Sequence, residues 1–119
     1  MDYLQYGLWA ILLFFIIRRM FPVKGVKHIT VGELKEKLHD KNKQYIDVRT
    51  SAEFKGRNIK GFKNIPLHLL DEKAQGLSKE KEVVLICQSG MRSNKASKEL
   101  KKQGFKEITN VKGGMNAWN

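Results

Sequence analysis

Residues 83–93 constrain the fold of this chain more strongly than any other part of the sequence. They begin with the apolar run Val83-Val84-Leu85-Ile86, which is typical of a strand buried on both faces. The run ends at Cys87, the only cysteine, and a short loop containing Gly90 leads to a helical pattern over residues 94–103. A strand, a tight loop and a helix in this order predict that Cys87 lies at the carboxyl edge of a sheet, where open α/β folds bind their ligands.

The loop after Cys87 is suited to stabilise a negatively charged sulfur. Backbone N–H groups of residues 88–92 can point inward around the sulfur, and the N-terminus of the following helix adds partial positive charge. This environment favours the thiolate, so Cys87 is the candidate nucleophile; the alternative is a buried structural cysteine that ends a core strand. Ser93 is expected mainly to cap the helix, with contact to the sulfur as a secondary role. The candidate substrate contacts in the loop are Gln88, Ser89, Gly90, Met91 and Arg92.

The N-terminal segment is strongly apolar. Residues Leu8–Ile17 form an uninterrupted apolar run, and the apolar character extends back to Tyr3. The fifteen residues 3–17 would form about 22 Å of helix, against a hydrocarbon core of about 30 Å. Tyrosines before the run and Arg18 and Arg19 after it can occupy the two membrane interfaces. We therefore expect residues 1–22 to form a transmembrane anchor and residues 23–119 to form one domain.

Two alternatives compete with this anchor. A cleaved signal peptide carries its positive residues before the apolar run, whereas here Asp2 precedes the run, Arg18 and Arg19 follow it, and no small-x-small cleavage site is visible. A helix lying in the membrane interface is the second alternative. Under the positive-inside rule, the basic residues after the run are expected to place the C-terminal domain in the cytoplasm. The expected location is therefore the cell membrane, as a single-pass protein.

The chain is strongly basic, with 23 lysine and arginine residues against 12 acidic ones and a formal net charge of +11. Without Arg18, Arg19 and Asp2, the remaining 21 basic and 11 acidic residues leave +10 on the domain. No aromatic side chains interleave the lysines as a nucleic-acid stacking platform requires, so attraction to anionic lipids explains the charge and no nucleic-acid partner is expected. The histidines lack metal-ligand spacing, so we expect no metal and no cofactor.

Strands and helices alternate along the domain. Two capping boxes, Thr30 with Glu33 and Thr50 with Glu53, mark the starts of helices. The expected strands are residues 26–29, 44–49, 64–66, 83–86 and 107–111. The expected helices are residues 30–39, a brief helix from residue 50 that ends before Gly56, residues 94–103, and a terminal helix started by Gly113-Gly114. This alternation predicts an α/β fold, in which helices cover both faces of a mostly parallel, five-stranded sheet in three layers.

Four short motifs of the domain point to a known family when they are taken together. They are Asp47-Val48-Arg49 followed by Glu53-Phe54, then Ile59-x-Gly61-x-x-Asn64-Ile65-Pro66, Cys87-x-x-Gly90-x-Arg92-Ser93, and Gly113-Gly114-Met115-x-x-Trp118. In this order and spacing the chain resembles a single-domain rhodanese, a sulfurtransferase that carries sulfur as a cysteine persulfide. It is similar in particular to the membrane-anchored bacterial members. The resemblance covers nearly the whole chain from about residue 28.

The resemblance implies the rhodanese-like fold and a two-step sulfur transfer. Cys87 would take sulfane sulfur from a donor such as thiosulfate and hold it as a persulfide, and cyanide or a thiol would then remove it. The donor and the acceptor are small molecules or proteins, and the oligomeric state stays open. Arg92 is expected to bind the oxygens of the donor or, alternatively, to pair with an acid that braces the loop. Arg57 is a second expected anion contact.

Asp47, Arg49 and Glu53 form a second candidate cluster. Asp47 is expected to support the site by helping to order the cysteine loop from a strand end. Arg49 and Glu53 are expected to form an ion pair that ties the short helix to its strand. The family usually has Gly-His where this chain has Arg57-Asn58. That departure bears more on substrate preference than on activity.

Two other functions remain open at this point. A non-catalytic, membrane-tethered binding module of the same fold is the first, and Cys87 argues against it, because such modules often lack the cysteine. A cysteine phosphatase is the second. Phosphatases need the spacing Cys-x5-Arg so that the loop surrounds a tetrahedral phosphate, whereas four residues separate Cys87 from Arg92. The shorter loop fits a single sulfur better.

Overall fold

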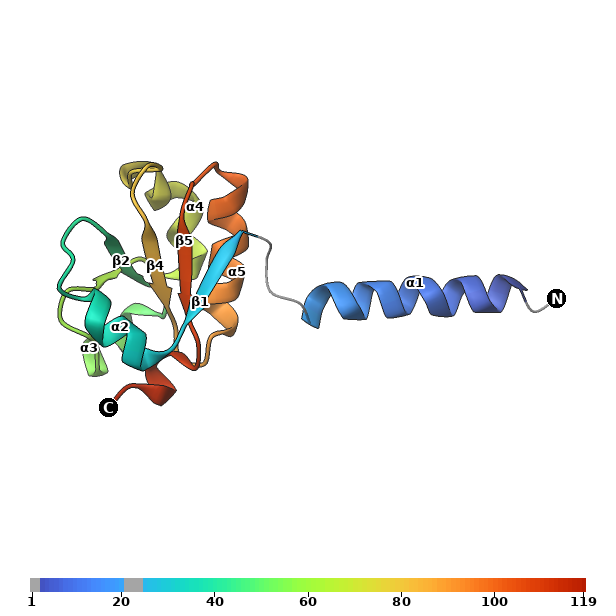
Figure 1. Cartoon of the computed structure of the whole chain (residues 1–119), viewed down its shortest axis with the longest axis horizontal. Helices are drawn as coiled ribbons and strands as arrows, with labels where there is room; N and C mark the ends of the chain where they lie inside the picture. The colour runs from blue at the N-terminus through green and yellow to red at the C-terminus, as the bar shows by residue number, and fades with distance from the viewer. Residues whose placement is uncertain (1–2, 21–24) are drawn as a thin grey trace.

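The domain is built on a five-stranded sheet. The computed structural model describes residues 3–20 and 25–119, and the sheet lies in the second range. Its strand order is β1-β5-β4-β2-β3, and every pairing is parallel (Figure 1). The strands are β1 (Val26–Ile29), β2 (Gln44–Asp47), β3 (Lys63–Asn64), β4 (Val83–Ile86) and β5 (Ile108–Val111). The predicted α/β fold is confirmed, and the sheet is wholly rather than mostly parallel.

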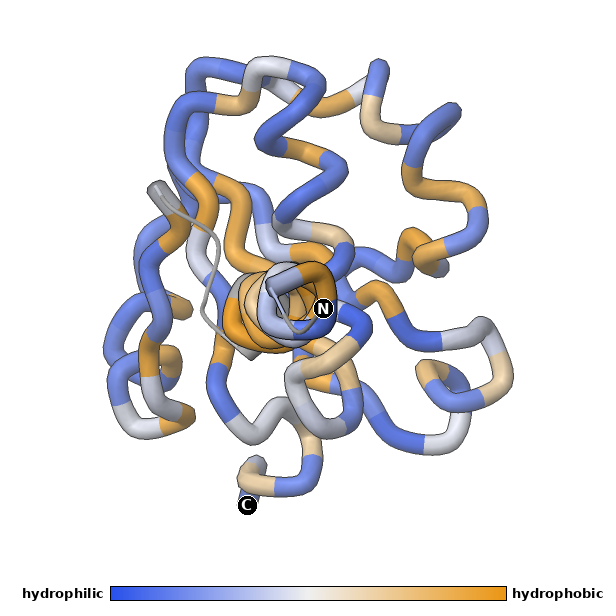
Figure 2. Tube along the Cα trace, turned by 90° about the vertical axis from the view of Figure 1, so that its right-hand side faces the viewer, coloured by the Kyte–Doolittle hydropathy of each residue, from blue (hydrophilic) through white to orange (hydrophobic). Residues whose placement is uncertain are grey.

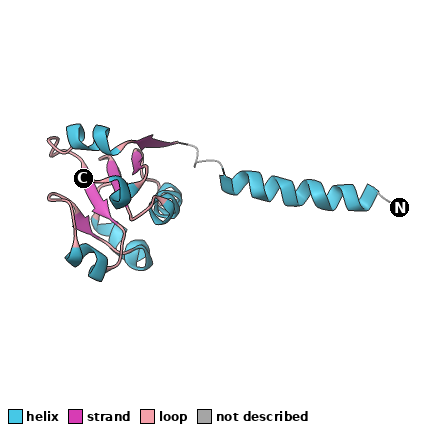
Figure 3. Cartoon of the chain, turned by 90° about the horizontal axis from the view of Figure 1, so that it is seen from below, coloured by secondary structure: helices cyan, strands magenta, loops and turns pink. Residues whose placement is uncertain are grey.

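Helices cover both faces of this sheet, as predicted (Figure 3). On one face, Leu34 packs in a cluster with Ile86; on the other, Leu70 and Leu100 pack in a cluster with Leu85. The helical segments of the domain are α2 (Val31–Lys37), α3 (Ser51–Gly56), η1 (Leu67–Leu69), α4 (Leu70–Lys73), η2 (Ala74–Gly76), α5 (Met91–Lys102) and η3 (Gly114–Ala117). Because parallel strands bury both faces, the strands read as continuous apolar runs.

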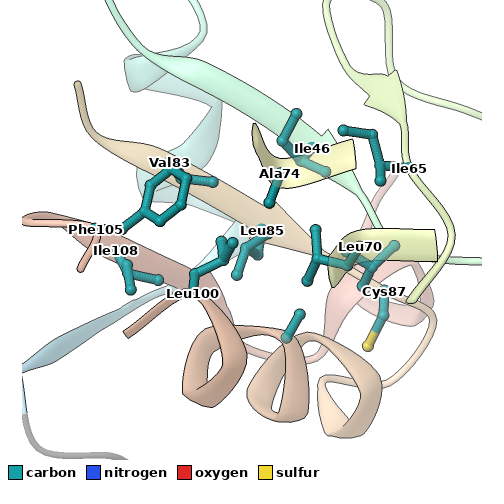
Figure 4. Packing of buried hydrophobic residues seen from close by; sticks show 12 residues of the cluster. Ile46, Ile65, Leu70, Ala74, Val83, Leu85, Cys87, Leu100, Phe105 and Ile108 are labelled. Carbon is teal, nitrogen blue, oxygen red and sulfur yellow. The ribbon is translucent and has the colours of Figure 1, made fainter. Parts of the chain in front are cut away.

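The central strand β4 carries Cys87 from the core to the carboxyl edge of the sheet. All four of its residues are fully buried. Successive side chains of a strand point to opposite faces, so Leu85 and Cys87 share the cluster beneath α5, while Ile86 faces the other side. Figure 4 shows Cys87 at one end of its cluster, with the sulfur pointing toward the first turn of α5. The predicted position of Cys87 at the sheet edge is confirmed.

Most of the predicted helix starts agree with the structure. Thr30 with Glu33 and Thr50 with Glu53 form complete capping boxes, each with hydrogen bonds in both directions. The predicted role of Ser93 as the cap of α5 is wrong. Gly90 is the N-cap, in the left-handed conformation at φ 107°, which lets the loop turn directly into a helix that begins at Met91. Ser93 is therefore inside the first turn.

The N-terminal helix α1 (Tyr3–Met20) has exposed apolar side chains over residues 8–17, and Figure 2 shows it nearly end-on. Among the residues that the structure describes, no helix has both the length and the apolar character needed to cross a bilayer. The uninterrupted run Leu8–Ile17 gives about 15 Å of helix, half the thickness of the hydrocarbon core. The prediction of a transmembrane helix is therefore wrong. Of the predicted boundary at residues 21–25, residues 21–24 lie outside the described residues.

Candidate active site

The thiol of Cys87 is fully buried and has two polar neighbours. The Gly90 N–H donates a hydrogen bond to its Sγ, with an N–S distance of 2.9 Å, and Ser93 Oγ lies 3.3 Å from the same sulfur. The Ser93 hydroxyl also donates to the Gly90 carbonyl at 3.1 Å. The sequence predicted a ring of N–H groups from residues 88–92; within residues 25–119, the Gly90 N–H alone contacts the sulfur. The site therefore offers one backbone donor and one hydroxyl.

The C-terminal turn holds the cysteine loop from behind. Met115 N–H donates to the Cys87 carbonyl at 2.8 Å, and Asn116 N–H donates to the Gln88 carbonyl at 2.9 Å. Gly114 has a φ of +52° and packs so closely that a Cβ would clash with the carbonyl oxygen of Cys87 and lie 2.9 Å from its carbonyl carbon. Sequence reasoning missed this supporting role, although the Gly113-Gly114 pair was a signal of close backbone approach.

Arg92 is held by Glu53, a partner that the sequence did not assign to it. Arg92 Nη1 and Nη2 donate to Glu53 Oε1 and Oε2 at 2.6 and 2.9 Å. These hydrogen bonds lower the pKa of Glu53 to about 2 and raise the pKa of Arg92. The charge of the nearby Cys87 also raises the pKa of Arg92. Thr50, the cap of α3, adds a hydroxyl donor to Glu53 at 3.0 Å. In this structure Arg92 takes the loop-bracing position that the sequence left as its alternative.

Asp47 and Arg49 form a buried ion pair beside the loop. Arg49 Nη2 lies 2.8 Å from Asp47 Oδ2, and Arg49 Nε donates to both carboxylate oxygens at 3.1 Å. Arg49 also donates to the side chain of Gln88 at 3.4 Å, so the pair reaches the cysteine loop. The predicted ion pair between Arg49 and Glu53 is wrong, because Arg49 bonds only the backbone carbonyl of Glu53, at 3.3 Å. Arg49 pairs with Asp47, which is two residues away at the end of β2, and the carboxylate of Glu53 is bound by Arg92 instead.

The remaining predicted contacts lie farther from the sulfur or face solvent. Ser89 is exposed, and Met91 is 80% exposed at the start of α5. The Arg57 guanidinium donates to the Trp118 carbonyl, so in this structure it ties α3 to the C-terminal segment. Asn58, at the family's usual histidine position, donates to a carbonyl of α3 at 2.8 Å and closes that helix. Over the described ranges, no three His, Cys, Asp or Glu side chains gather as metal ligands would.

Comparisons with known proteins agree with this geometry. Residues 30–119 match the family described as "Rhodanese-like domain". The protein YtwF of Bacillus subtilis is 44% identical over 94 residues, which are 78% of this chain and 90% of that protein. A protein named sulfurtransferase from Allochromatium vinosum is 33% identical over 94 residues, covering 78% of this chain and 88% of its own. The crystal structure of a rhodanese-like domain protein from Staphylococcus aureus superimposes with a TM-score of 0.72 at 36% identity, covering 78% of this chain and 91% of that one. With a family match over residues 30–119 and a shared fold, this chain belongs to the rhodanese-like domain family.

Proposed function

We propose that this protein is a sulfurtransferase that moves sulfane sulfur from a donor such as thiosulfate to a thiol or to cyanide through a persulfide on Cys87. The observation that carries the proposal is the sulfur of Cys87 at the end of the central strand, with the Gly90 N–H at 2.9 Å and Ser93 Oγ at 3.3 Å. Both groups can donate to a thiolate, because the Ser93 hydroxyl can rotate away from the Gly90 carbonyl. The relative from Allochromatium vinosum that is named a sulfurtransferase supports the same activity.

In the first half-reaction, the Cys87 thiolate attacks the outer sulfur of thiosulfate. The S–S bond of thiosulfate breaks, and sulfite leaves with the electron pair of that bond. The enzyme keeps the outer sulfur as a persulfide anion, Cys87–S–S⁻. Because the thiolate and the persulfide both carry one negative charge, the donors at Gly90 and Ser93 and the helix α5 N-terminus can stabilise each of them.

In the second half-reaction, an acceptor nucleophile attacks the outer sulfur of the persulfide. The S–S bond of the persulfide breaks, and the Cys87 thiolate leaves, ready for another cycle. Cyanide would leave as thiocyanate and a thiolate would leave as a new persulfide. No second cysteine exists in the chain to receive the sulfur, so the acceptor comes from outside the molecule.

Arg92 supports this chemistry through its charge and through the position of the loop. Its guanidinium is engaged by Glu53 at 2.6 and 2.9 Å, so direct binding of donor oxygens would compete with that ion pair. We therefore propose that Arg92 braces the loop and adds positive potential near the sulfur. Arg57 would contact an anionic donor only after leaving the Trp118 carbonyl.

The test is a comparison of thiosulfate:cyanide transfer by the natural protein and by Cys87→Ser, with circular dichroism to check the fold. Loss of transfer with an intact fold supports the proposal. Normal turnover by Cys87→Ser would end it. Absence of transfer in both proteins would favour the binding module, and hydrolysis of p-nitrophenyl phosphate through Cys87 would favour the phosphatase.

We propose further that α1 attaches the domain to a lipid surface without the span that the sequence suggested. The support is the exposed apolar side chains on successive turns of α1, together with the basic charge of the chain. The cytoplasmic location stays a prediction. The positive-inside rule behind it applies to helices that cross the membrane. Flotation of the full chain with liposomes tests the attachment, and a variant lacking residues 1–22 should remain unbound and active.

A further inference from the structure

The outer face of α5 is not used by the chemistry proposed above. Four of its residues are spaced four, three and four positions apart, so they line up along one side of the helix. They are Met91, Lys95, Lys98 and Lys102, and all four are exposed. The residues that α5 buries lie on the opposite side: Ser93, Ala96, Ser97 and Leu100. We call the four exposed residues the outer stripe, which extends over about 16 Å of helix.

The outer stripe is positively charged, and no ion pair within the described residues neutralises it. None of its three lysines takes part in such a pair there. The helix has four lysines in all against one acidic residue, Glu99, which leaves +3. Arg92 is left out of this count because Glu53 already neutralises it. The outer side of α5 therefore presents cationic charge to solvent.

The end of the stripe at the cysteine loop is apolar. Met91 is 80% exposed, and over residues 25–119 it is the one large apolar side chain that the structure leaves exposed. Single exposed apolar residues are common on protein surfaces, but this one lies in line with three unpaired lysines. Lysines combined with exposed apolar side chains are typical of helices that lie on a membrane surface.

The chain itself brings α5 close to the segment that we propose attaches to lipid. The Nζ of Lys101 lies where a Cβ on Gly25 would be only 2.7 Å away, so this end of α5 is next to the start of β1. Figure 1 shows α5 beside that strand. Only residues 21–24 separate Gly25 from α1, and the five steps from Met20 span at most about 18 Å. A lipid surface that holds α1 is therefore within reach of α5.

We propose that the outer stripe of α5 docks on an anionic lipid bilayer and holds the domain against the surface to which α1 attaches. The lysines would contact lipid phosphates, and Met91 would enter the boundary between headgroups and acyl chains. The proposal rests on the lipid attachment of α1 proposed above and adds the face of the domain that meets the lipid. An acidic protein offers the same charge, but the exposed apolar α1 in the same chain favours lipid.

Position decides which lysines contribute to this docking. Attraction to an anionic surface falls off within a Debye length, about 8 Å at physiological ionic strength. Each lysine on the docked face therefore strengthens binding by about fivefold, and lysines on the far side of the domain add little. Three lysines alone bind weakly, so α1 provides the attachment and the outer stripe sets the orientation. Because the stripe begins at Met91, next to Gly90, this orientation brings the cysteine loop to the lipid surface.

The first experiment is flotation of full-length proteins with two kinds of liposome, one of phosphatidylcholine and one that also contains phosphatidylglycerol. We expect the natural protein to bind the anionic liposomes more strongly than the neutral ones. The triple variant Lys95→Gln/Lys98→Gln/Lys102→Gln should lose about tenfold or more of its affinity for the anionic liposomes. Its binding to neutral liposomes should stay the same, since α1 is unchanged. Circular dichroism checks that the fold is intact.

The matched control is Lys41→Gln/Lys60→Gln/Lys63→Gln, which removes the same charge from exposed lysines without ion pairs in the described residues. These lysines precede β2 or lie beside and in β3, the edge strand opposite β1. The control should lose less than about threefold. Equal losses in the two triple variants would overturn the proposal, because net charge alone would then explain the binding.

The same experiment separates the docking surface from the attachment of α1. A natural protein that binds neutral and anionic liposomes equally would overturn the docking surface and leave the attachment through α1 intact. Absence of binding to either kind of liposome would overturn both proposals. The sulfurtransferase function does not enter these outcomes, because no step of the experiment requires sulfur transfer.

A second experiment maps the face of the domain that meets the lipid. The full chain is acetylated with N-hydroxysuccinimide acetate, with and without anionic liposomes, and the modified lysines are located by peptide mass spectrometry. We expect the liposomes to slow the acetylation of the three outer-stripe lysines and to leave Lys60 and Lys63 as reactive as in the free protein. Unchanged reactivity of the stripe on bound liposomes would overturn the proposal. Protection by polyglutamate and not by liposomes would assign the stripe to an acidic protein, and would overturn lipid docking.

Discussion

The guanidinium of Arg92 and the carboxylate of Glu53 form a two-point ion pair, with distances of 2.6 and 2.9 Å. The two residues are 39 positions apart and come from α5 and α3. These helices pack in the two different core clusters, so the pair joins the two helical layers at the edge of the sheet that carries Cys87. A loop fixed in this way keeps its donors aimed at the sulfur without reorganisation.

This ion pair should make stability depend on acid. The folded pKa of Glu53 is about 2, below its ordinary value of 4.5, so the pair stabilises the fold above pH 4.5 and loses this effect as the pH falls toward 2. About a third of each side chain is exposed, so solvent screens the pair and we expect about 1 kcal/mol. Thermal unfolding between pH 2 and 6 should show a smaller acid-induced drop for Glu53→Gln than for the natural protein.

Glu33→Gln is the control for that measurement. Glu33 has the same capping-box position in α2, and it forms no ion pair within the described residues. Its variant should keep the acid dependence of the natural protein. Identical curves for Glu53→Gln and the natural protein would contradict the assigned role of the ion pair.

The buried pair of Asp47 and Arg49 should be costly to break. Asp47→Ala leaves the guanidinium of Arg49 buried without its carboxylate, which should destabilise the fold by about 3–5 kcal/mol. Sulfur transfer should also fall, since Arg49 reaches the loop through Gln88. Urea unfolding measures the first effect. The exposed pair of Glu80 and Lys106 gives the comparison, because solvent screens it. Glu80→Ala should cost far less stability than Asp47→Ala, and equal losses in both variants would refute the prediction.

A methyl group at position 114 should disrupt the site from behind. Gly114→Ala places a Cβ against the Cys87 carbonyl, and its φ of +52° disfavours any side chain. We expect a loss of more than about 2 kcal/mol of stability and most of the transfer rate. Gly76→Ala is the control, because a Cβ there has no neighbour within 4 Å. A fully active Gly114→Ala protein would show that the C-terminal turn does not fix the conformation of the cysteine loop.

The hydroxyl of Ser93 should matter to the rate rather than to the fold. Ser93→Ala removes the oxygen that lies 3.3 Å from Cys87 Sγ, and persulfide formation should slow by about fivefold. Ser97 is a buried serine one turn later that donates to the Ser93 carbonyl at 2.8 Å and does not contact the sulfur. Stopped-flow measurement with thiosulfate should therefore find Ser97→Ala faster than Ser93→Ala. The reverse order would remove Ser93 from the mechanism.

The strands and the place of Cys87 could be predicted because each depends on local patterns. The run Val83–Ile86 is apolar on both faces, and the capping boxes at Thr30 and Thr50 are set by neighbours three residues apart. The predicted start of α5 is wrong, and the reason is also local. A serine is a common N-cap, but Gly90 in the left-handed conformation provides the turn three residues before Ser93.

The partners of the charged residues could not be predicted, because they depend on how distant elements meet. Arg49 and Glu53 are close in sequence and suggested an ion pair, yet the fold brings Arg92 to Glu53 and leaves Arg49 to Asp47. The contact of Gly114 with the Cys87 carbonyl is equally non-local. The prediction of a transmembrane helix is wrong for a different reason. It relied on the flanking tyrosines and arginines to extend the helix across the bilayer, and the apolar run alone is too short to cross it.

The most direct test of the account is the intact mass of the protein after incubation with thiosulfate and removal of the excess. The account predicts a mass gain of one sulfur atom on the natural protein, reversed by dithiothreitol or by cyanide, and no gain on Cys87→Ser. A natural protein that gains no sulfur, or a Cys87→Ser protein that gains the same sulfur, would contradict the persulfide on Cys87.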